Sequence, residues 1–259
     1  LLAHTGLARL YERSDASVRV LEGLPSATGW LRQGAGDDGH TALTIREHGW
    51  QLTVDVAEGH KTGYYLDQRD SRGHFAQAVR HFGVQRVLNC YSYTGGFSVA
   101  ALAGGASDVT SVDSSAPALA RAEAHVALNG FDPARHHVAD ADVNTFLRQA
   151  IERGERWDAI VLDPPKFAPT AAHAERAARA YKDINRLAFK LLVPGGLLYT
   201  FSCSGGVPAD LFHKIVAGAG LDAGIDGDIH ARLAAAPDHP MTVTFPEGEY
   251  LKGLVIVRR

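Results

Sequence analysis

An acidic corner and a cysteine carry the chemistry that this sequence could perform. Asp163 opens the run Asp163-Pro164-Pro165-Lys166-Phe167, and Cys203 lies within Phe201-Ser202-Cys203-Ser204-Gly205 about 40 residues later. Both follow apolar runs typical of buried strands, so a parallel sheet would place the two side chains at the same edge. A thiolate there can attack an electron-poor ring, and an acid beside it can stabilise the charge that develops. The pair therefore predicts covalent catalysis on a pyrimidine ring.

Both residues also have structural interpretations. An Asp-Pro step is a common turn, and a buried cysteine is most often a small packing residue. The strand-end position and the flanking serines favour a site at Cys203, whereas Cys90 is better explained by packing or by main chain next to a ligand. A nucleophilic thiol needs a cation or a helix N-terminus that lowers its pKa. Lys166 and the helix predicted after Gly206 are the candidates.

A glycine-containing turn, Tyr91-Ser92-Tyr93-Thr94-Gly95-Gly96, follows the first strand of an alternating region. Glycines there let main chain approach a ligand and open a helix whose N-terminus favours negative charge. The spacing is not Gly-x-Gly-x-x-Gly, which disfavours an NAD-dependent dehydrogenase. An ordinary strand–helix turn is the structural alternative.

Two further carboxylates follow the next two predicted strands. Asp113 lies about 20 residues past the glycine turn, where a carboxylate can accept both ribose hydroxyls, or it could cap the following helix. Asp142 could receive an adenine amino group, or it could only begin a helix. Three such features at three successive strand ends predict an adenosine-containing ligand.

Strands and helices alternate along most of the chain. The predicted strands cover residues 86–90, 109–112, 136–139, 157–162, 196–201, 242–244 and 254–257. The predicted helices cover residues 97–103, 114–129, 143–153, 171–192 and 209–219. This order predicts an α/β fold with a mostly parallel sheet, helices on both faces and ligands at the carboxyl ends of the strands.

The first part of the chain has a different pattern. Val18 and Val20 alternate with polar neighbours, as do Leu52, Val54 and Val56, which predicts half-buried strands, and residues 34–39 predict a loop. We therefore expect a small β-rich segment over residues 1–72, followed by the α/β domain over residues 73–259.

Composition limits the class of protein. No apolar run is long enough for a membrane helix, and two cysteines are too few for a disulfide framework, so a cytoplasmic protein is expected. The 13 histidines are scattered, so no metal site is expected. With a net charge of −3, any RNA surface must be local. Four basic residues of the long helix could follow phosphates, or form a solvated face with interleaved acids: Arg176, Arg179, Lys182 and Arg186.

The longer motifs resemble the RlmI family, class I S-adenosylmethionine (SAM)-dependent methyltransferases that form 5-methylcytidine in large-subunit ribosomal RNA. The resemblance spans nearly the whole chain and rests on residues 11–15, 59–72, 89–98, 163–167, 181–185, 201–205 and 246–253. It implies a Rossmann-like domain with a seven-stranded sheet. Family members usually carry an N-terminal PUA domain that binds RNA, and we expect that domain to be absent from this sequence or left out of it.

The resemblance also implies roles for individual residues. The methionine part of SAM would lie against Asn89, Tyr91, Ser92, Tyr93, Thr94, Gly95 and Phe97. Asp113 with Ser114 would bind the ribose, and Asp142 with Val143 would meet the adenine. Lys61, Gln68 and Arg69 would close over the cofactor or the target. Cys203 matches the nucleophile position and Asp163 the acid, which would also border the cofactor. Large-subunit ribosomal RNA is the implied partner, and a homodimer is one assembly to test.

Three details stay open at this level. Lys166 stands where many RNA cytosine-5 enzymes have a second cysteine, and it could instead lower the thiol pKa or hold an RNA phosphate. Phe167 or Tyr93 would stack on the target base or simply pack. The alternatives are a methyltransferase acting on a guanine or other base nitrogen, which needs no thiol, and a SAM- or RNA-binding module without catalysis.

Overall fold

The computed structural model describes the chain except for residues 17, 35–37, 60–62, 168–173 and 246–247. The chain divides into two compact units, Leu1–Tyr65 and Leu66–Arg259. The predicted boundary at residue 72 falls within α3 (Arg69–Phe82), the first α-helix of the second unit.

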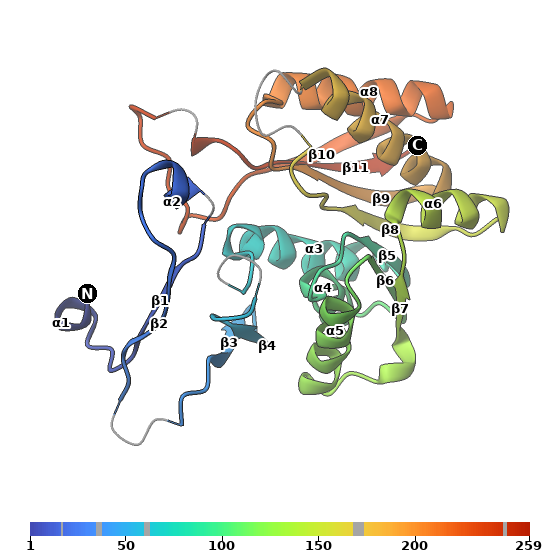
Figure 1. Ribbon diagram of the computed structural model, residues 1–259. Coiled ribbons are helices and arrows are strands. Elements are labelled where there is room, and N and C mark those ends of the chain that lie inside the picture. Colours follow the sequence, from blue (N-terminus) through green and yellow to red (C-terminus); the bar gives the residue numbers. More distant parts are fainter. Residues whose placement is uncertain (17, 35–37, 60–62, 168–173, 246–247) are drawn as a thin grey trace. The chain divides into compact units, whose positions relative to one another are not determined.

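The described residues of the first unit form two antiparallel strand pairs and two helices of one turn each. Figure 1 shows where these elements lie along the chain. The strand pairs are β1 (Leu10–Ser14) with β2 (Ala27–Arg32), and β3 (Ala42–Glu47) with β4 (Trp50–Asp55). The helices are α1 (Leu2–Thr5) and α2 (Val18–Leu21). In β4, Leu52 and Val54 are buried and alternate with more exposed neighbours, which confirms the strand predicted there.

The strand predicted around Val18 and Val20 is wrong. These residues form α2, and the main-chain N–H of Gly23 donates to the carbonyl of Val20 as the turn closes. Val20 and Leu21 are exposed, so an alternating strand would have no buried face to cover. Within the predicted loop over residues 34–39, residues 35–37 lie outside the described residues.

The second unit is built on a seven-stranded sheet with the order β10-β11-β9-β8-β5-β6-β7. Its strands are β5 (Arg86–Cys90), β6 (Asp108–Asp113), β7 (His136–Asp140), β8 (Trp157–Leu162), β9 (Leu192–Ser202), β10 (Gly227–Leu233) and β11 (Lys252–Arg258). Strands β5 to β9 run parallel, and β11 runs antiparallel between β9 and β10. The mostly parallel sheet is confirmed.

Two details of the strand prediction fail. The strand predicted at residues 242–244 is wrong, because the main-chain N–H of Phe245 closes a turn on Thr242 and Val243 is fully exposed. Strand β10 was not predicted, because its residues are mostly exposed and its strand state depends on pairing with the distant β11.

Helices cover both faces of the sheet (Figure 1). One face carries α3, α4 (Gly96–Gly104) and α5 (Ala116–Leu128), and the other carries α6 (Val143–Glu152), α7 (Ala174–Leu191) and α8 (Ala209–Ala223). The described part of this unit also has two 3-10 turns, η1 (Leu66–Gln68) and η2 (Pro133–Arg135). The α7 face buries a continuous apolar core around Ile160, Tyr181 and Phe212. On the α3 face, the ring of Phe75 packs edge-on against Phe97 and Tyr199.

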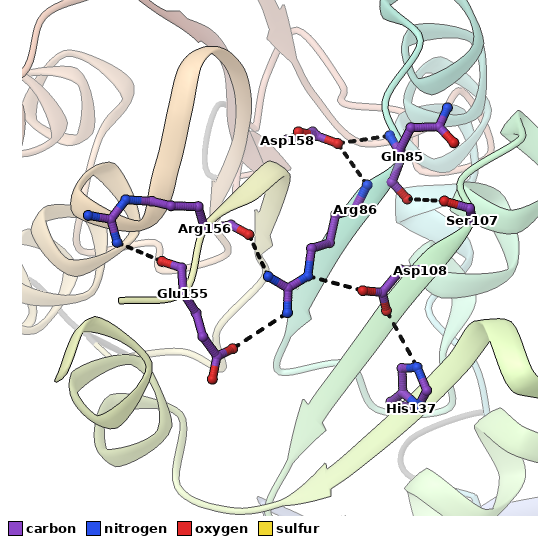
Figure 2. A network of polar contacts seen from close by, with 8 residues as sticks. All are labelled: Gln85, Arg86, Ser107, Asp108, His137, Glu155, Arg156 and Asp158. Atoms are coloured by element: carbon purple, nitrogen blue, oxygen red, sulfur yellow. Dashed lines mark hydrogen bonds and ion pairs between the residues drawn. The ribbon is translucent and has the colours of Figure 1, made fainter. Parts of the chain in front are cut away.

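The sheet has two functionally different edges. At the amino edge, where the parallel strands begin, the carboxylate of Asp158 accepts the main-chain N–H groups of Gln85 and Arg86 at 3.0 and 2.8 Å. The Arg86 guanidinium binds the Asp108 carboxylate at 3.0 Å and the carbonyl of Arg156 at 2.9 Å (Figure 2). These bonds fix β5, β6 and β8 relative to one another. The carboxyl edge, where the parallel strands end and β11 begins, therefore presents its side chains in a defined register.

Candidate active site

The turn after β5 has an unusual backbone. Tyr91 and Tyr93 have φ angles of 56° and 47°, and Gly95 has a φ angle of 75°. Tyrosine rarely occupies this left-handed region, and residues held there concentrate at ligand-binding sites. Gly95 is also sterically required, because a Cβ at that position would lie 2.6 Å from the Cβ of Ala122 on α5. The turn is thus pressed closely onto α5.

Asp113 fixes the turn from the end of the neighbouring strand. One carboxylate oxygen accepts the main-chain N–H of Tyr93 at 2.8 Å, and the other accepts that of Ser115 at 3.0 Å. The cap of α5 is Ser115, whose hydroxyl accepts the N–H of Ala118, so Asp113 does not serve as the helix cap. A carboxylate has about four acceptor positions. Asp113 can therefore hold the turn and still accept ribose hydroxyls.

A histidine that was not identified from the sequence also holds the turn. Nδ1 of His125, which is fully buried on α5, donates to the carbonyl of Thr94 at 2.8 Å.

A second set of buried polar side chains supports the turn from β5, β6 and α4. Nδ2 of Asn89 donates to the hydroxyl of Ser98 at 2.9 Å, and that hydroxyl lies 2.7 Å from the hydroxyl of Ser111. These bonds make the turn part of the rigid core.

Asp142, which was predicted to contact the adenine of the cofactor, has a structural role. Asp142 is the N-cap of α6, and its Oδ1 accepts both the main-chain N–H and the hydroxyl of Thr145 at 2.9 Å. Val143 is buried in the core, and Ser114 is exposed beside Asp113. Asp142 therefore begins a helix, and its contact with adenine stays a prediction.

Two buried polar groups suit a polar ligand. The Gln68 side chain is 2% exposed, and among the described residues neither its amide oxygen nor its amide nitrogen has a hydrogen-bond partner. The same holds for the hydroxyl of Ser92 in the turn. Leaving such atoms unbonded costs free energy, so water or a ligand is expected to bond them. The amino and carboxylate groups of the methionine part of SAM offer a matching donor and acceptors.

Three other residues were predicted to contact the cofactor, namely Arg69, Phe97 and Lys61. Arg69 forms ion pairs with Asp238 at 2.6 Å and with Asp70 at 3.0 Å. Phe97 is buried and its ring packs against Phe75 and Phe201, which favours a packing role. Lys61 lies outside the described residues.

At the other end of the carboxyl edge, the structure brings the cysteine and the acidic corner together. The thiol of Cys203 is half-buried and donates to the carbonyl of Pro164, with 3.8 Å between sulfur and oxygen. Asp163, also half-buried, directly precedes that proline at the end of β8. Cys90 is fully buried, and burial raises the pKa of its thiol. Of the two cysteines, Cys203 is therefore the one that solvent can reach.

Aromatic and charged residues surround Cys203. The hydroxyl of Tyr181, on α7, lies 3.0 Å from that of Ser204, and the Phe167 ring packs 4.8 Å from the Tyr181 ring. This contact favours the packing interpretation of Phe167. Lys166 is exposed.

The basic residues of α7 are mostly paired with acids. Arg179 pairs with Glu175 and Arg186 with Asp183 on the same helix, and Lys182 pairs with Asp222 on α8. These pairs favour the interpretation of a solvated, charged helix face.

The sequence did not identify the residues that β11 brings to this site. Lys252 is 7% exposed, and its Nζ donates to the carbonyl of Ser204 at 2.7 Å. The Tyr250 hydroxyl donates to the buried carboxylate of Asp67 at 2.6 Å. Both lie in the motif at residues 246–253, which supported the family resemblance but gave no role. Their position became clear only from the pairing of Lys252 with Ser202 in the sheet.

The described residues show neither a metal-binding cluster nor a membrane-spanning helix. They contain no group of three or more His, Cys, Asp or Glu side chains that could hold a metal ion. None of their helices is long and apolar enough to cross a membrane.

Comparison with known proteins agrees with this geometry. Residues 21–225 match a family described as S-adenosylmethionine-dependent methyltransferase. Proteins named Ribosomal RNA large subunit methyltransferase I are 52% identical in Alteromonas mediterranea and 51% identical in Aeromonas salmonicida, over 95% and 96% of this chain. The predicted resemblance is thereby confirmed. The chain spans only 60% and 62% of the lengths of these two relatives.

Solved structures show the same fold. A crystal structure of a methyltransferase complexed with SAH superimposes with a TM-score of 0.77 and 27% identity, covering 89% of this chain and 58% of the other. A SAM-dependent methyltransferase from Agrobacterium tumefaciens has a TM-score of 0.68 and 17% identity, covering 99% and 78%. The predicted Rossmann-like methyltransferase fold is confirmed.

Proposed function

Because the chain belongs to the S-adenosylmethionine-dependent methyltransferase family, we propose that it methylates C5 of a cytidine in large-subunit ribosomal RNA through a covalent bond to Cys203. The observation that carries the proposal is the half-buried Cys203 thiol bonded to the Pro164 carbonyl, one residue from Asp163. The relatives named for ribosomal RNA support the substrate class. A cytoplasmic location belongs to the same proposal.

The proposed mechanism assigns each residue a step. The Cys203 thiolate adds to C6 of the cytosine, which turns C5 into a nucleophile. Asp163 holds the ring at N3, where electron density rises as the sulfur–carbon bond forms. SAM, when bound, supplies an electrophilic methyl group. After transfer, a base takes the C5 proton, the C6–sulfur bond breaks, and the thiolate of Cys203 is restored.

The cofactor would lie against the turn, at the carboxyl edge of the sheet. The turn residues from Tyr91 to Gly95, with Gln68, would hold the methionine part, and Asp113 would hold the ribose. The target base must leave its stack to reach Cys203, as in other enzymes that modify bases. Lys166, exposed near the thiol, is the proposed contact for an RNA phosphate.

Mass analysis of the methylated nucleoside tests the proposal. Wild-type protein, ribosomal RNA and SAM should yield 5-methylcytidine, and Cys203→Ala should yield none while SAM binding changes less than about twofold. Cys90→Ala is the matched control, because that thiol is fully buried, and it should retain activity if the protein folds. RNA containing 5-fluorocytidine should form an adduct with wild-type protein only. Wild-type turnover by Cys203→Ala, or a methylated guanine as the product, would overturn the covalent mechanism.

A further inference from the structure

We propose that Lys252 is the positioning residue that promotes ionisation of the Cys203 thiol, acting as a buried cation bonded to the segment that carries this cysteine. The proposal rests on the covalent role proposed for Cys203. The evidence is that Lys252 begins β11 and lies next to the segment of Cys203. The sequence alone had given Lys252 no role.

The sheet places Lys252 next to the cysteine. In the antiparallel pairing of β11 with β9, Lys252 is the partner of Ser202, the residue before Cys203. Its Nζ donates to the carbonyl of Ser204, the residue after Cys203, at 2.7 Å. The neighbouring Gly253 allows this close approach, because a Cβ there would lie 2.6 Å from the Phe201 ring. The ammonium is therefore anchored to the segment that carries the thiol.

The charge of Lys252 needs a nearby anion. Its side chain is 7% exposed, and burial lowers the pKa of its ammonium, because a desolvated charge is unfavourable. Electrostatic attraction to Cys203 and then to Glu249 opposes this change in the pKa of Lys252, and repulsion from Lys166 adds to it. The Ser204 carbonyl supplies only a neutral acceptor. Of these two anions, a thiolate at Cys203 attracts the buried ammonium more strongly than the Glu249 carboxylate does, and the ammonium in turn favours the thiolate.

The other groups around the thiol do not replace this cation. Tyr181 on α7 and Tyr250 before β11 both interact electrostatically with Cys203, but each is neutral or negative. Asp163 and Glu249 are acidic and would oppose ionisation of the thiol. Lys166 on the segment after β8 is a cation, but it is exposed, so water screens its charge. Among the described residues near the thiol, Lys252 is the buried cation.

The pH dependence of Cys203 alkylation tests the proposal without RNA or SAM. Iodoacetamide reacts with the thiolate, and mass analysis of the Cys203 peptide reports this site alone. Lys252→Gln keeps a donor for the Ser204 carbonyl but removes the charge. It should raise the apparent pKa of the reaction and lower the rate at pH 7 about tenfold, which corresponds to one pKa unit. Lys252→Arg should restore most of the rate, and Lys214→Gln, on the exposed face of α8, should leave it unchanged.

A reciprocal measurement does not depend on how well the Lys252 variants fold. Removing the thiolate by Cys203→Ser should lower the pKa of Lys252, followed by NMR of labelled lysine side chains, because coupling between two sites is mutual. An unchanged alkylation profile in folded Lys252→Gln, a larger shift in Lys166→Gln, or an unchanged Lys252 titration would each overturn the proposal. If Cys203→Ala retains methylation, the covalent mechanism fails, while the alkylation result still decides the role of Lys252.

Discussion

The two edges of the seven-stranded sheet differ in how their polar groups are bonded. At the amino edge, Arg86, Asp108 and Asp158 satisfy one another and the main chain (Figure 2). At the carboxyl edge, the turn after β5 keeps a left-handed backbone, and Gln68 and Ser92 keep buried polar atoms without partners among the described residues. Buried atoms without a hydrogen-bond partner among the described residues occur at the amino edge as well, namely Oδ1 of Asp108 and Nε1 of Trp157, so the left-handed turn is the feature that the carboxyl edge has in addition. The comparison teaches that a strained backbone locates a candidate site better than polarity or unbonded polar atoms do.

The largest effect is expected on SAM affinity, from Gly95→Ala at the carboxyl edge. A side chain at φ 75° is strained, and its Cβ would lie 2.6 Å from that of Ala122. The turn must then move away from α5, at a cost of about 3 kcal/mol or more. We expect SAM affinity to fall at least about 100-fold in isothermal titration calorimetry, since a tenfold change corresponds to about 1.4 kcal/mol.

Gly105, at the other end of the same helix, is the matched control. Its φ angle is 111°, but a Cβ there would meet nothing within 4 Å. Gly105→Ala should lower the melting temperature and leave SAM affinity unchanged within about twofold. Similar losses of affinity in both variants would mean that the turn does not hold the cofactor.

The sequence predicted the parallel strands well for a physical reason. The central strands β5 and β8 are buried on both faces, so they have mostly apolar sequences, and they match the predicted residues 86–90 and 157–162. Strand β10 failed because its residues are exposed and only pairing with β11 makes it a strand. Thr242-Val243-Thr244 has strand-forming residues but no partner strand among the described residues.

The candidate site was predictable to a similar extent. Residues that end a parallel strand or directly follow one, such as Asp113 and Cys203, could be placed at one edge from their position alone. Lys252 could not, because it reaches the edge only through the antiparallel insertion of β11 between β9 and β10. The left-handed conformation of Tyr91 and Tyr93 was also hidden, since no glycine stands at those positions to indicate it.

A smaller effect, on stability, is expected from His136. This residue begins β7 at the amino edge and contacts the buried polar set that supports the turn at the carboxyl edge. Its Nε2 lies 2.8 Å from the hydroxyl of Ser111, within the buried set that supports the turn. Burial, with the neighbouring His137, lowers the pKa of His136 from 6.5 to about 4. As pH falls through this interval, the unfolded chain binds a proton before the folded chain does, so stability is lost between pH 6.5 and 4. The loss is about 3 kcal/mol at most, and none of it is present above pH 7.

Urea unfolding of His136→Gln measures this contribution. The variant should lack the acid-dependent loss, so its stability relative to the wild type should improve by up to about 3 kcal/mol from pH 7 to pH 4. Parallel pH profiles of wild type and His136→Gln would show that the histidine does not titrate in this interval.

The smallest of the three effects is expected from Arg86→Met at the amino edge. Arg86 is partly exposed, donates to Asp108 and to the Arg156 carbonyl, and lies 4.8 Å over the Trp157 ring. Losing these contacts should lower the free energy of unfolding by about 2 kcal/mol. Arg179→Met removes an exposed pair with Glu175 on α7 and should cost less than about 0.5 kcal/mol. Because Arg86 only aligns strand beginnings, SAM affinity in the folded variant should stay within about twofold of the wild type. A tenfold loss of affinity would show that the two edges are energetically coupled, and it would remove the distinction between a stabilising edge and a ligand-binding edge.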